Sequence, residues 1–281
     1  MTAGWDQSAA AWIAALGEHG DYTRTHILDP VMKARVAGRG FASALDVGCG
    51  EGRFCRIMRE HGISTVGIDP TCVLLDRARH LDPVGDYHSA RAEELPFPDE
   101  RFDLVVSYLS LIDIADAEQA IAEMARVLKC GGSLLIANLT SFSSAAAPGW
   151  VRDDTGKAIH CHPVDNYLDE RAEWFEWNGI RIRNWHRPLS TYMRILLMQG
   201  LRLTFFDEPA AIDNDDERAT NVRRRPWAMV MEWRKDCTAH GSNTPKADSR
   251  AATRCANSDR TRSRTRRLAL GTFSPLCRPA R

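Results

Sequence analysis

The amino-acid sequence predicts an α/β fold with a mostly parallel sheet that is covered by helices on both faces. Three observations lead to this prediction. Short apolar runs alternate with segments of helical periodicity along the chain, which is the pattern of repeated strand and helix units. The apolar runs are nearly continuous, as expected for strands buried on both faces. The 281 residues are 44% hydrophobic, which is enough to bury one sizeable core.

Two helices are expected before the first strong strand, over Gln7–Leu16 and about Tyr22–Val36. The alternation then begins, and Thr71 is expected to be the N-cap of its second helix. The expected strands are "SALDVG", "STVGID", "DYHSA" and "DLVVSYLS". A helix, "GRFCRIMREHG", follows the first strand, and a second helix, "TCVLLDRARHL", follows the second strand.

The alternation continues in the second half of the chain. A helix is expected from Asp116 to Lys129, because apolar residues recur on one of its faces and Gly131-Gly132 can end it. The remaining elements are the strand "SLLIANL", the helix "TYMRILLMQG", the strand "LRLTFFDEP" and the last strand "WAMVMEWR".

The composition indicates a globular enzyme of the cytoplasm. No apolar run approaches the roughly 18 to 20 residues of a membrane span, and the first residues lack the pattern of a secretory signal. The eight cysteines include no Cys-x-x-Cys pair, so we expect reduced thiols. The sequence gives no indication of oligomeric state.

The formal net charge of zero conceals a basic C-terminal segment. From Asp236 onward, ten lysines and arginines stand against three acidic residues. We expect residues 236–281 to be a disordered basic tail, because their few apolar residues cannot offset the entropy of ordering them. A solvated extension without function is favoured over a nucleic-acid-binding tail.

The stretch "ALDVGCGEG" follows the first strand, where open parallel sheets bind ligands. Gly48, Gly50 and Gly52 permit a sharp turn into the next helix and a close approach of ligand to main chain. Asp46 is unsuited to a phosphate and suits an ammonium group and ribose hydroxyls. The glycine spacing also differs from the G-x-G-x-x-G pattern of dinucleotide-binding proteins.

A second carboxylate, Asp69, ends the next strand nineteen residues after Gly50. At this position it can accept hydrogen bonds from both hydroxyls of a ribose. The combination predicts a site for an adenosine-containing ligand, in preference to a tight turn beside a surface aspartate.

The sequence resembles the class I S-adenosylmethionine-dependent methyltransferases, in particular the small-molecule group with a type 11-like domain. The resemblance covers about Gly20 to Lys235 and implies a Rossmann-like sheet of seven strands, with the last strand, "WAMVMEWR", antiparallel. It also implies S-adenosyl-L-methionine as methyl donor. The segments that carry it are "LDVGCGEGRFCRIM", "TVGIDPTCVLLDRAR", "ARAEELPFPDERFDLVVS" and "EQAIAEMARVLKCGGSLLIANL".

The resemblance also implies roles for individual residues. The glycine loop of Gly48, Gly50 and Gly52 would lie under the methionine part of the cofactor, with Asp46 near its amino group and Asp69 on the ribose. The remaining contacts would come from Pro70, Thr71 and Glu93, from the main chain of Ala92, and from Ser107 near the acceptor. Arg91 departs from the pattern, because related enzymes often have an acidic residue there and arginine has no acceptor atom.

Residues 140–189 form an insertion that we expect to cover the acceptor site. Asn178-Gly179 predicts a type I′ hairpin that pairs Trp177 with Ile180 and Trp174 with Arg183. The alternative is a packing hairpin distant from the cavity.

Two histidine-containing segments in the insertion are candidates for a catalytic base or a metal site. His186 is the candidate catalytic base, although a loop histidine bonded to the backbone is the favoured alternative. The segment "IHCHP" has no second ligand cluster, so we expect no metal site.

The sequence therefore predicts N-terminal helices over 1–40, a methyltransferase domain over 41–235 and a tail over 236–281. The enzyme is expected to move a methyl group to a small-molecule acceptor by in-line displacement. The alternatives are a non-catalytic S-adenosylmethionine-binding regulator and an RNA methyltransferase or RNA-binding protein that uses the tail.

Overall fold

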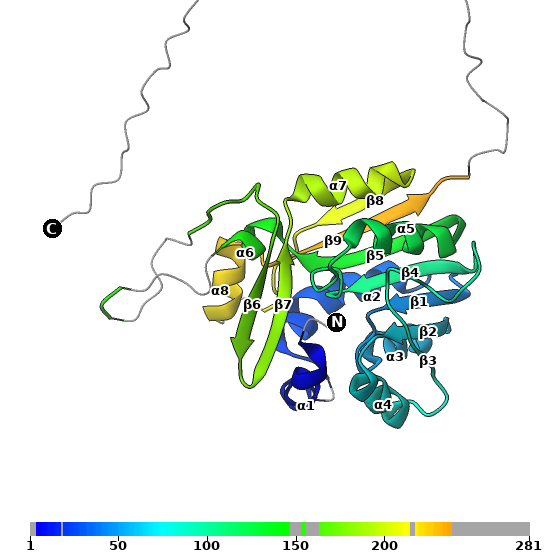
Figure 1. The fold of residues 1–281 in the computed structure, drawn as a ribbon, viewed down its shortest axis with the longest axis horizontal. Coiled ribbons are helices and arrows are strands. Elements are labelled where there is room, and N and C mark those ends of the chain that lie inside the picture. The colour runs from blue at the N-terminus through cyan, green and yellow to red at the C-terminus, as the bar shows by residue number, and fades with distance from the viewer. Residues whose placement is uncertain (1–3, 18, 147–152, 156–162, 214–216, 238–281) are drawn as a thin grey trace, which may run out of the picture. The chain divides into compact units, whose positions relative to one another are not determined.

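The computed structural model describes residues 4–17, 19–146, 153–155, 163–213 and 217–237. Their centre is a seven-stranded sheet of order β3-β2-β1-β4-β5-β9-β8 (Figure 1). Its strands are β1 (Ser43–Val47), β2 (Ser64–Asp69), β3 (Asp86–Ser89), β4 (Phe102–Tyr108), β5 (Leu128–Leu139), β8 (Leu201–Asp207) and β9 (Ala228–Lys235).

Strand β9 is antiparallel to both of its neighbours, β5 and β8, so the other six strands point in one direction. This confirms the predicted fold class, including the antiparallel last strand. The strand order reverses between β1 and β4, where open α/β sheets form a crevice at their carboxyl edge. Asp46 lies at this point, opposite Gly67 of β2 and Val106 of β4.

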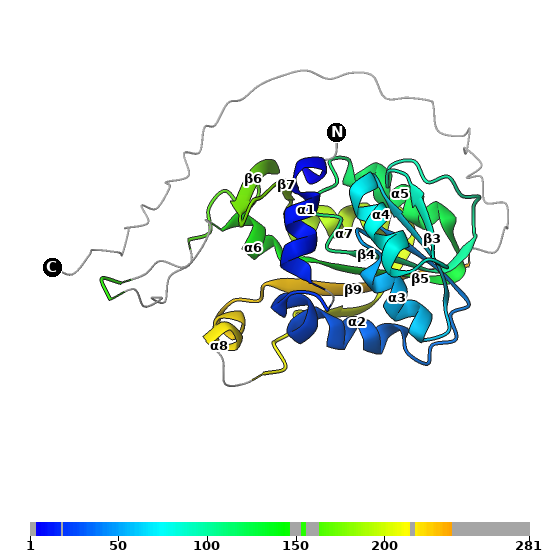
Figure 2. The same ribbon diagram turned by 90° about the horizontal axis from the view of Figure 1, so that it is seen from below.

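Helices cover both faces of the sheet, as the near-continuous apolar strands predict (Figure 2). Helices α5 (Ala117–Val127) and α7 (Leu189–Met198) pack into one core cluster, which also contains Leu45 and Ile136. Helices α2 (Asp29–Val36) and α3 (Arg53–Glu60) pack into the cluster on the opposite face with Ala44. Helix α4 (Cys72–Leu81) contributes to a smaller cluster around Tyr87.

The N-terminal segment contains α1 (Trp5–Leu16) and a helix whose first part is the π-helical turn η1 (Arg24–Leu28), followed by α2. Thr71 occupies the N-cap position of α4, as predicted, but its side chain makes no capping hydrogen bond. Helix α5 ends at Val127 and β5 begins at once, so the predicted helix end at Lys129 was two residues too late.

Two short helices had no sequence prediction, α6 (Ser141–Ala145) and α8 (Glu217–Arg224). Helix α8 is strongly polar and buries only Ala219. A helix without an apolar stripe gives no periodic signal in the sequence.

The hairpin of the insertion consists of β6 (Arg171–Trp177) and β7 (Ile180–His186), in the predicted register. Asn178 and Gly179 both have positive φ, at 46° and 79°, as a type I′ turn requires. The Trp174 ring stacks on Arg181, 4.2 Å from its guanidinium carbon, and this diagonal contact was not predicted.

Cys130 and Cys237 form a disulfide, with 5.0 Å between their Cα atoms. The expectation of reduced thiols was therefore wrong for this pair. Strand β9 runs antiparallel to β5, so the end of β9 lies beside the start of β5. A cysteine pair separated by 107 residues has no local sequence signal, which is why the pairing was not predicted. Cys49, Cys55 and Cys72 are free thiols.

None of the helices in the described ranges has the length and apolar character to cross a bilayer. Most of the predicted tail and the histidines of "IHCHP" lie outside the described residues.

Candidate active site

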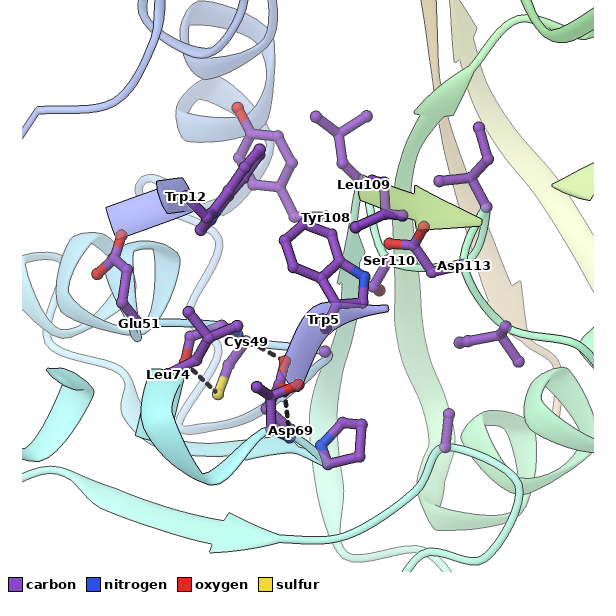
Figure 3. Close-up of a pocket in the computed structure, with 18 of the residues that line it drawn as sticks. Trp5, Trp12, Cys49, Glu51, Asp69, Leu74, Tyr108, Leu109, Ser110 and Asp113 are labelled. Carbon is purple, nitrogen blue, oxygen red and sulfur yellow. Dashed lines mark hydrogen bonds between the residues drawn. The ribbon is translucent and has the colours of Figure 1, made fainter. Parts of the chain in front are cut away.

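A cavity of about 420 Å³ opens at the carboxyl ends of β1, β2 and β4 (Figure 3). One part of its wall comes from the segments that follow β1, β2 and β3. The other part comes from the loop after β4, from α1 and from the hairpin. We call the first part the glycine-loop side; it contains Asp46, Gly48, Gly50, Asp69, Pro70, Thr71, Ala92 and Glu93. We call the second part the apolar side; it contains Trp5, Trp12, Leu109, Ile112, Asp113, Trp177, Ile182 and Asn184.

The three glycines of the loop all have positive φ, between 56° and 75°, but they serve different purposes. A Cβ on Gly48 would lie 2.3 Å from the Cβ of Ser110, so the loop after β4 packs directly on it. A Cβ on Gly52 would collide with the ring of Tyr87, and Gly52 does not line the cavity. A Cβ on Gly50 would meet no described atom within 4 Å, so Gly50 leaves room for a ligand.

Asp46 is almost completely buried, with 1% of its surface exposed. Its Oδ2 accepts a hydrogen bond from Cys55 Sγ at 3.4 Å, whereas no hydrogen bond from the described residues reaches Oδ1. Burial is the main cause that raises the pKa of Asp46 to about 7. A buried carboxyl group with one oxygen that lacks a partner, beside a glycine loop, is suited to a ligand that brings an ammonium group.

Asp69 is fixed by the main chain of its neighbours. Its Oδ2 accepts from Gly50 N at 3.0 Å and its Oδ1 from Thr71 N at 2.8 Å. Burial raises the pKa of this carboxyl, although the two backbone N–H groups oppose that effect. Each oxygen of an ionised carboxylate can accept more than one hydrogen bond, so Asp69 can still bind ligand hydroxyls.

The segment after β3 brings Arg91, Ala92 and Glu93 to the cavity wall. Arg91 Nη2 donates to Glu93 Oε1 at 2.7 Å. Arg91 therefore engages the side chain that the resemblance assigns to the cofactor.

Ser107 does not line the cavity, because its side chain is fully buried against Ser110. The two hydroxyl oxygens are 2.8 Å apart, and Ser110 Oγ donates to the carbonyl of Val47. Ser110 thus links the Ser107 hydroxyl to the end of β1, directly before the glycine loop.

His186 also lies away from the cavity, with 2% of its surface exposed. Its Nδ1 is 2.8 Å from Ser144 Oγ and its Nε2 donates to the carbonyl of Tyr167 at 2.8 Å. Burial lowers its pKa, which favours the neutral ring. Both ring nitrogens are engaged within the insertion, which removes His186 from the candidates for a catalytic base.

Asp113, Trp5 and Trp12 line the cavity and were missed in the sequence. Asp113 lies in the loop after β4 and accepts a hydrogen bond from Asn184 Nδ2. Figure 3 shows the indole nitrogen of Trp5 on the side of Asp113. The one available signal was a single carboxylate in the apolar run "LSLIDI", directly beyond a strand end.

Helix α1 contacts both β7 and α4 and so spans the cavity between the hairpin and the sheet. Ser8 Oγ donates to the carbonyl of Arg181 at 3.0 Å and accepts from its N–H at 2.9 Å. The hydroxyl of Ser8 thereby fixes α1 to β7.

Residues 45–136 match the family model of a methyltransferase domain. Malonyl-[acyl-carrier protein] O-methyltransferase of Salmonella typhimurium is 33% identical over 133 residues, which are 47% of this chain and 53% of that protein. Phosphatidylethanolamine N-methyltransferase of Cereibacter sphaeroides is 37% identical over 111 residues, 37% of this chain and 54% of that protein. The chain thus spans about half the length of the curated relatives it matches.

Solved structures extend the similarity over most of the fold. An S-adenosylmethionine-dependent methyltransferase from Mesorhizobium loti is 26% identical with a TM-score of 0.65, over 78% of this chain and all of that one. A Listeria monocytogenes protein assigned to the same class is 25% identical with a TM-score of 0.64, over 82% and 99% of the two chains. Together with the family model, these structures show that the chain carries a methyltransferase domain of class I, the class that takes its methyl group from S-adenosylmethionine.

Proposed function

We propose that this protein transfers a methyl group from S-adenosylmethionine to a small, partly apolar acceptor by in-line displacement. The observation that carries the proposal is that one cavity has two unlike walls. Its glycine-loop side offers main chain and carboxylates, and its apolar side offers aromatic and aliphatic side chains. Such a cavity can hold a polar cofactor and an apolar acceptor next to each other.

The residues of the glycine-loop side fit the cofactor. Oδ1 of Asp46 would accept from the methionine ammonium, and Asp69 would accept from the ribose hydroxyls. Gly50 leaves the space in which the cofactor would approach the main chain. Pro70, Thr71, Ala92 and Glu93 line the part of the wall expected beside the adenine. When bound, the cofactor supplies an electrophilic methyl group on a sulfonium.

The apolar side would orient the acceptor and exclude water. Trp177 and Ile182 of the hairpin line it, which supports the proposal that the insertion 140–189 covers the acceptor. Trp5 and Trp12 add a second aromatic wall from α1. Positioning the acceptor nucleophile behind the methyl group can supply much of the rate enhancement, because the two reactants no longer need to meet in solution. Residues 41–235 would then be the catalytic domain, with residues 1–40 completing its site.

Calorimetric titration with S-adenosylmethionine and S-adenosylhomocysteine tests the proposal. The wild-type protein should bind both, and Asp46→Asn and Asp69→Ala should each weaken binding at least about tenfold, because each removes a charge-assisted hydrogen bond. Glu118→Gln is the matched control, since Glu118 is exposed on α5 and outside the cavity. Absence of binding by the wild-type protein, or full binding by Asp46→Asn, would contradict the proposal.

The proposed methyl transfer has its own readout. Release of S-adenosylhomocysteine in a screen of small apolar acceptors would support it. Cofactor binding without release from any acceptor would favour a non-catalytic regulator.

A further inference from the structure

The cavity contains three buried or half-buried carboxylates that form no ion pair within the described residues, Asp46, Asp69 and Asp113. Its other acidic side chains are paired: Asp21 with Arg24, Glu51 with Arg56 and Glu93 with Arg91, each at 2.7 Å. The proposed function assigns Asp46 and Asp69 to the cofactor. Asp113 remains without an assigned ligand group.

Asp113 lies where an acceptor must approach. Ser110, three residues earlier, packs on Gly48 and donates to the carbonyl of Val47, so the loop after β4 is attached to the methionine end of the cofactor site. Asp113 N donates to the carbonyl of Ser110 at 2.9 Å, which turns the loop back into the cavity. The carboxylate is therefore close to the glycine loop but on the apolar side.

Neutral side chains from two elements face the carboxylate. Asn184 Nδ2 of β7 donates a hydrogen bond to it. Trp5 of α1 lines the same cavity with its indole nitrogen on the side of Asp113 (Figure 3), so the two elements that cover the acceptor space converge on Asp113. Ile112 and Ile182 line the cavity nearby and keep its surroundings apolar. An ionised carboxylate in such surroundings favours a ligand group that carries a hydrogen or a positive charge.

We propose, on the basis of the proposed function, that Asp113 selects acceptors whose nucleophile is an O–H or N–H group, and disfavours acceptors that present a carboxylate. The acceptor oxygen or nitrogen would donate its hydrogen bond to Asp113 and direct a lone pair at the methyl carbon. As the new bond to carbon forms, the carbon–sulfur bond breaks, its electron pair goes to sulfur, and the acceptor's proton passes to Asp113 and then to solvent.

The electrostatic surroundings are compatible with this role. Burial raises the pKa of Asp113 to about 7, with Asp69 raising it and Arg24 lowering it. A group with such a pKa can exchange a proton near neutral pH. Of the arginines that line the cavity, Arg24 is paired with Asp21, and Arg183 lies 5.7 Å from the centre of the Trp185 ring.

The test compares three probes of equal size, benzylamine, benzyl alcohol and benzoate, titrated at pH 8 into the protein saturated with S-adenosylhomocysteine. We expect the wild-type protein to bind the amine and the alcohol at least about tenfold more tightly than benzoate, because a like charge next to Asp113 is costly. In Asp113→Asn the difference should fall below about threefold. Glu118→Gln should keep the wild-type preference.

The inference would be overturned if the wild-type protein bound the three probes equally, preferred benzoate or bound none of them. It would also be overturned if the preference for the amine persisted in Asp113→Asn. Cofactor affinity separates this failure from failure of the proposed function. Asp113→Asn should bind S-adenosylhomocysteine within about twofold of the wild-type protein, because its side chain keeps the size of Asp113. If the wild-type protein did not bind the cofactor, the proposed function itself would fail.

Discussion

The two sides of the cavity are assembled in different ways. Most of the glycine-loop side comes from one continuous stretch, Asp46 to Thr71, which leaves β1, forms α3 and returns along β2. The apolar side combines α1, the loop after β4 and the hairpin, which are far apart in the sequence. The proposed cofactor site is therefore encoded locally, whereas the proposed acceptor site depends on how distant segments meet.

Two glycines of the glycine-loop side are expected to have different roles. Gly48→Ala places a Cβ 2.3 Å from Ser110 at a φ of +75°, and we expect a loss of roughly 3 kcal/mol in the free energy of unfolding. Gly50→Ala meets no described atom, so it should cost about 1 kcal/mol while abolishing cofactor binding. Denaturant unfolding and calorimetry measure the two effects. Equal stability losses would contradict the proposed division of roles.

Asp46→Asn should separate stability from binding. In the wild-type protein the folded-state pKa of Asp46 is about 7, above its ordinary 3.8. The folded state therefore retains a proton that the unfolded state loses between about pH 4 and 7, and the stability contributed by this group falls as pH rises through that range.

The asparagine side chain has no such titration. Asp46→Asn should therefore gain stability relative to the wild-type protein as pH rises from 4 to 8, by at most about 4 kcal/mol, while cofactor binding weakens at least about tenfold. Urea unfolding of both proteins at pH 5 and pH 8 checks this result. A stability difference that does not change with pH would show that Asp46 is ionised throughout in the folded protein.

A smaller effect is expected on the apolar side, to which α1 contributes. Ser8→Ala removes both hydrogen bonds between α1 and Arg181 and should cost about 1 to 2 kcal/mol of stability. It should also weaken binding of the benzyl probes, because α1 carries Trp5. Ser64→Ala, at an exposed strand start, is the control. Unchanged probe binding would mean that α1 does not organise the acceptor space.

The smallest expected effect concerns Arg91, which stands where related enzymes often have an acidic residue. Arg91→Asp replaces a cation that is half exposed and bonded to Glu93 with an acidic acceptor before Ala92. Cofactor affinity should rise by about three- to tenfold, the range of one additional hydrogen bond. Weaker binding by this variant would mean that Arg91 itself contributes to the site.

The sequence predicted the parts of the molecule that are encoded locally. Apolar periodicity gave the strands and most helices, and the spacing of Asp46, the glycines and Asp69 indicated the glycine-loop side of the cavity, which we propose binds the cofactor. The Asn178-Gly179 turn predicted the hairpin register, because a two-residue loop leaves no freedom in the pairing.

The remaining features depend on contacts that no local pattern contains. Asp113 meets Trp5 and Asn184 only after α1, β4 and β7 have come together. The same holds for the disulfide between Cys130 and Cys237. His186 was a plausible base in the sequence, but the fold turns its ring toward Ser144 and Tyr167.

A crystal structure with S-adenosylhomocysteine bound would test the central claim most directly. We expect the amino group of the ligand within hydrogen-bond distance of Asp46 Oδ1, its ribose hydroxyls on Asp69, and its sulfur facing the apolar side that holds Asp113. A ligand bound elsewhere, or an Asp46 Oδ1 that remains without a partner, would contradict the account.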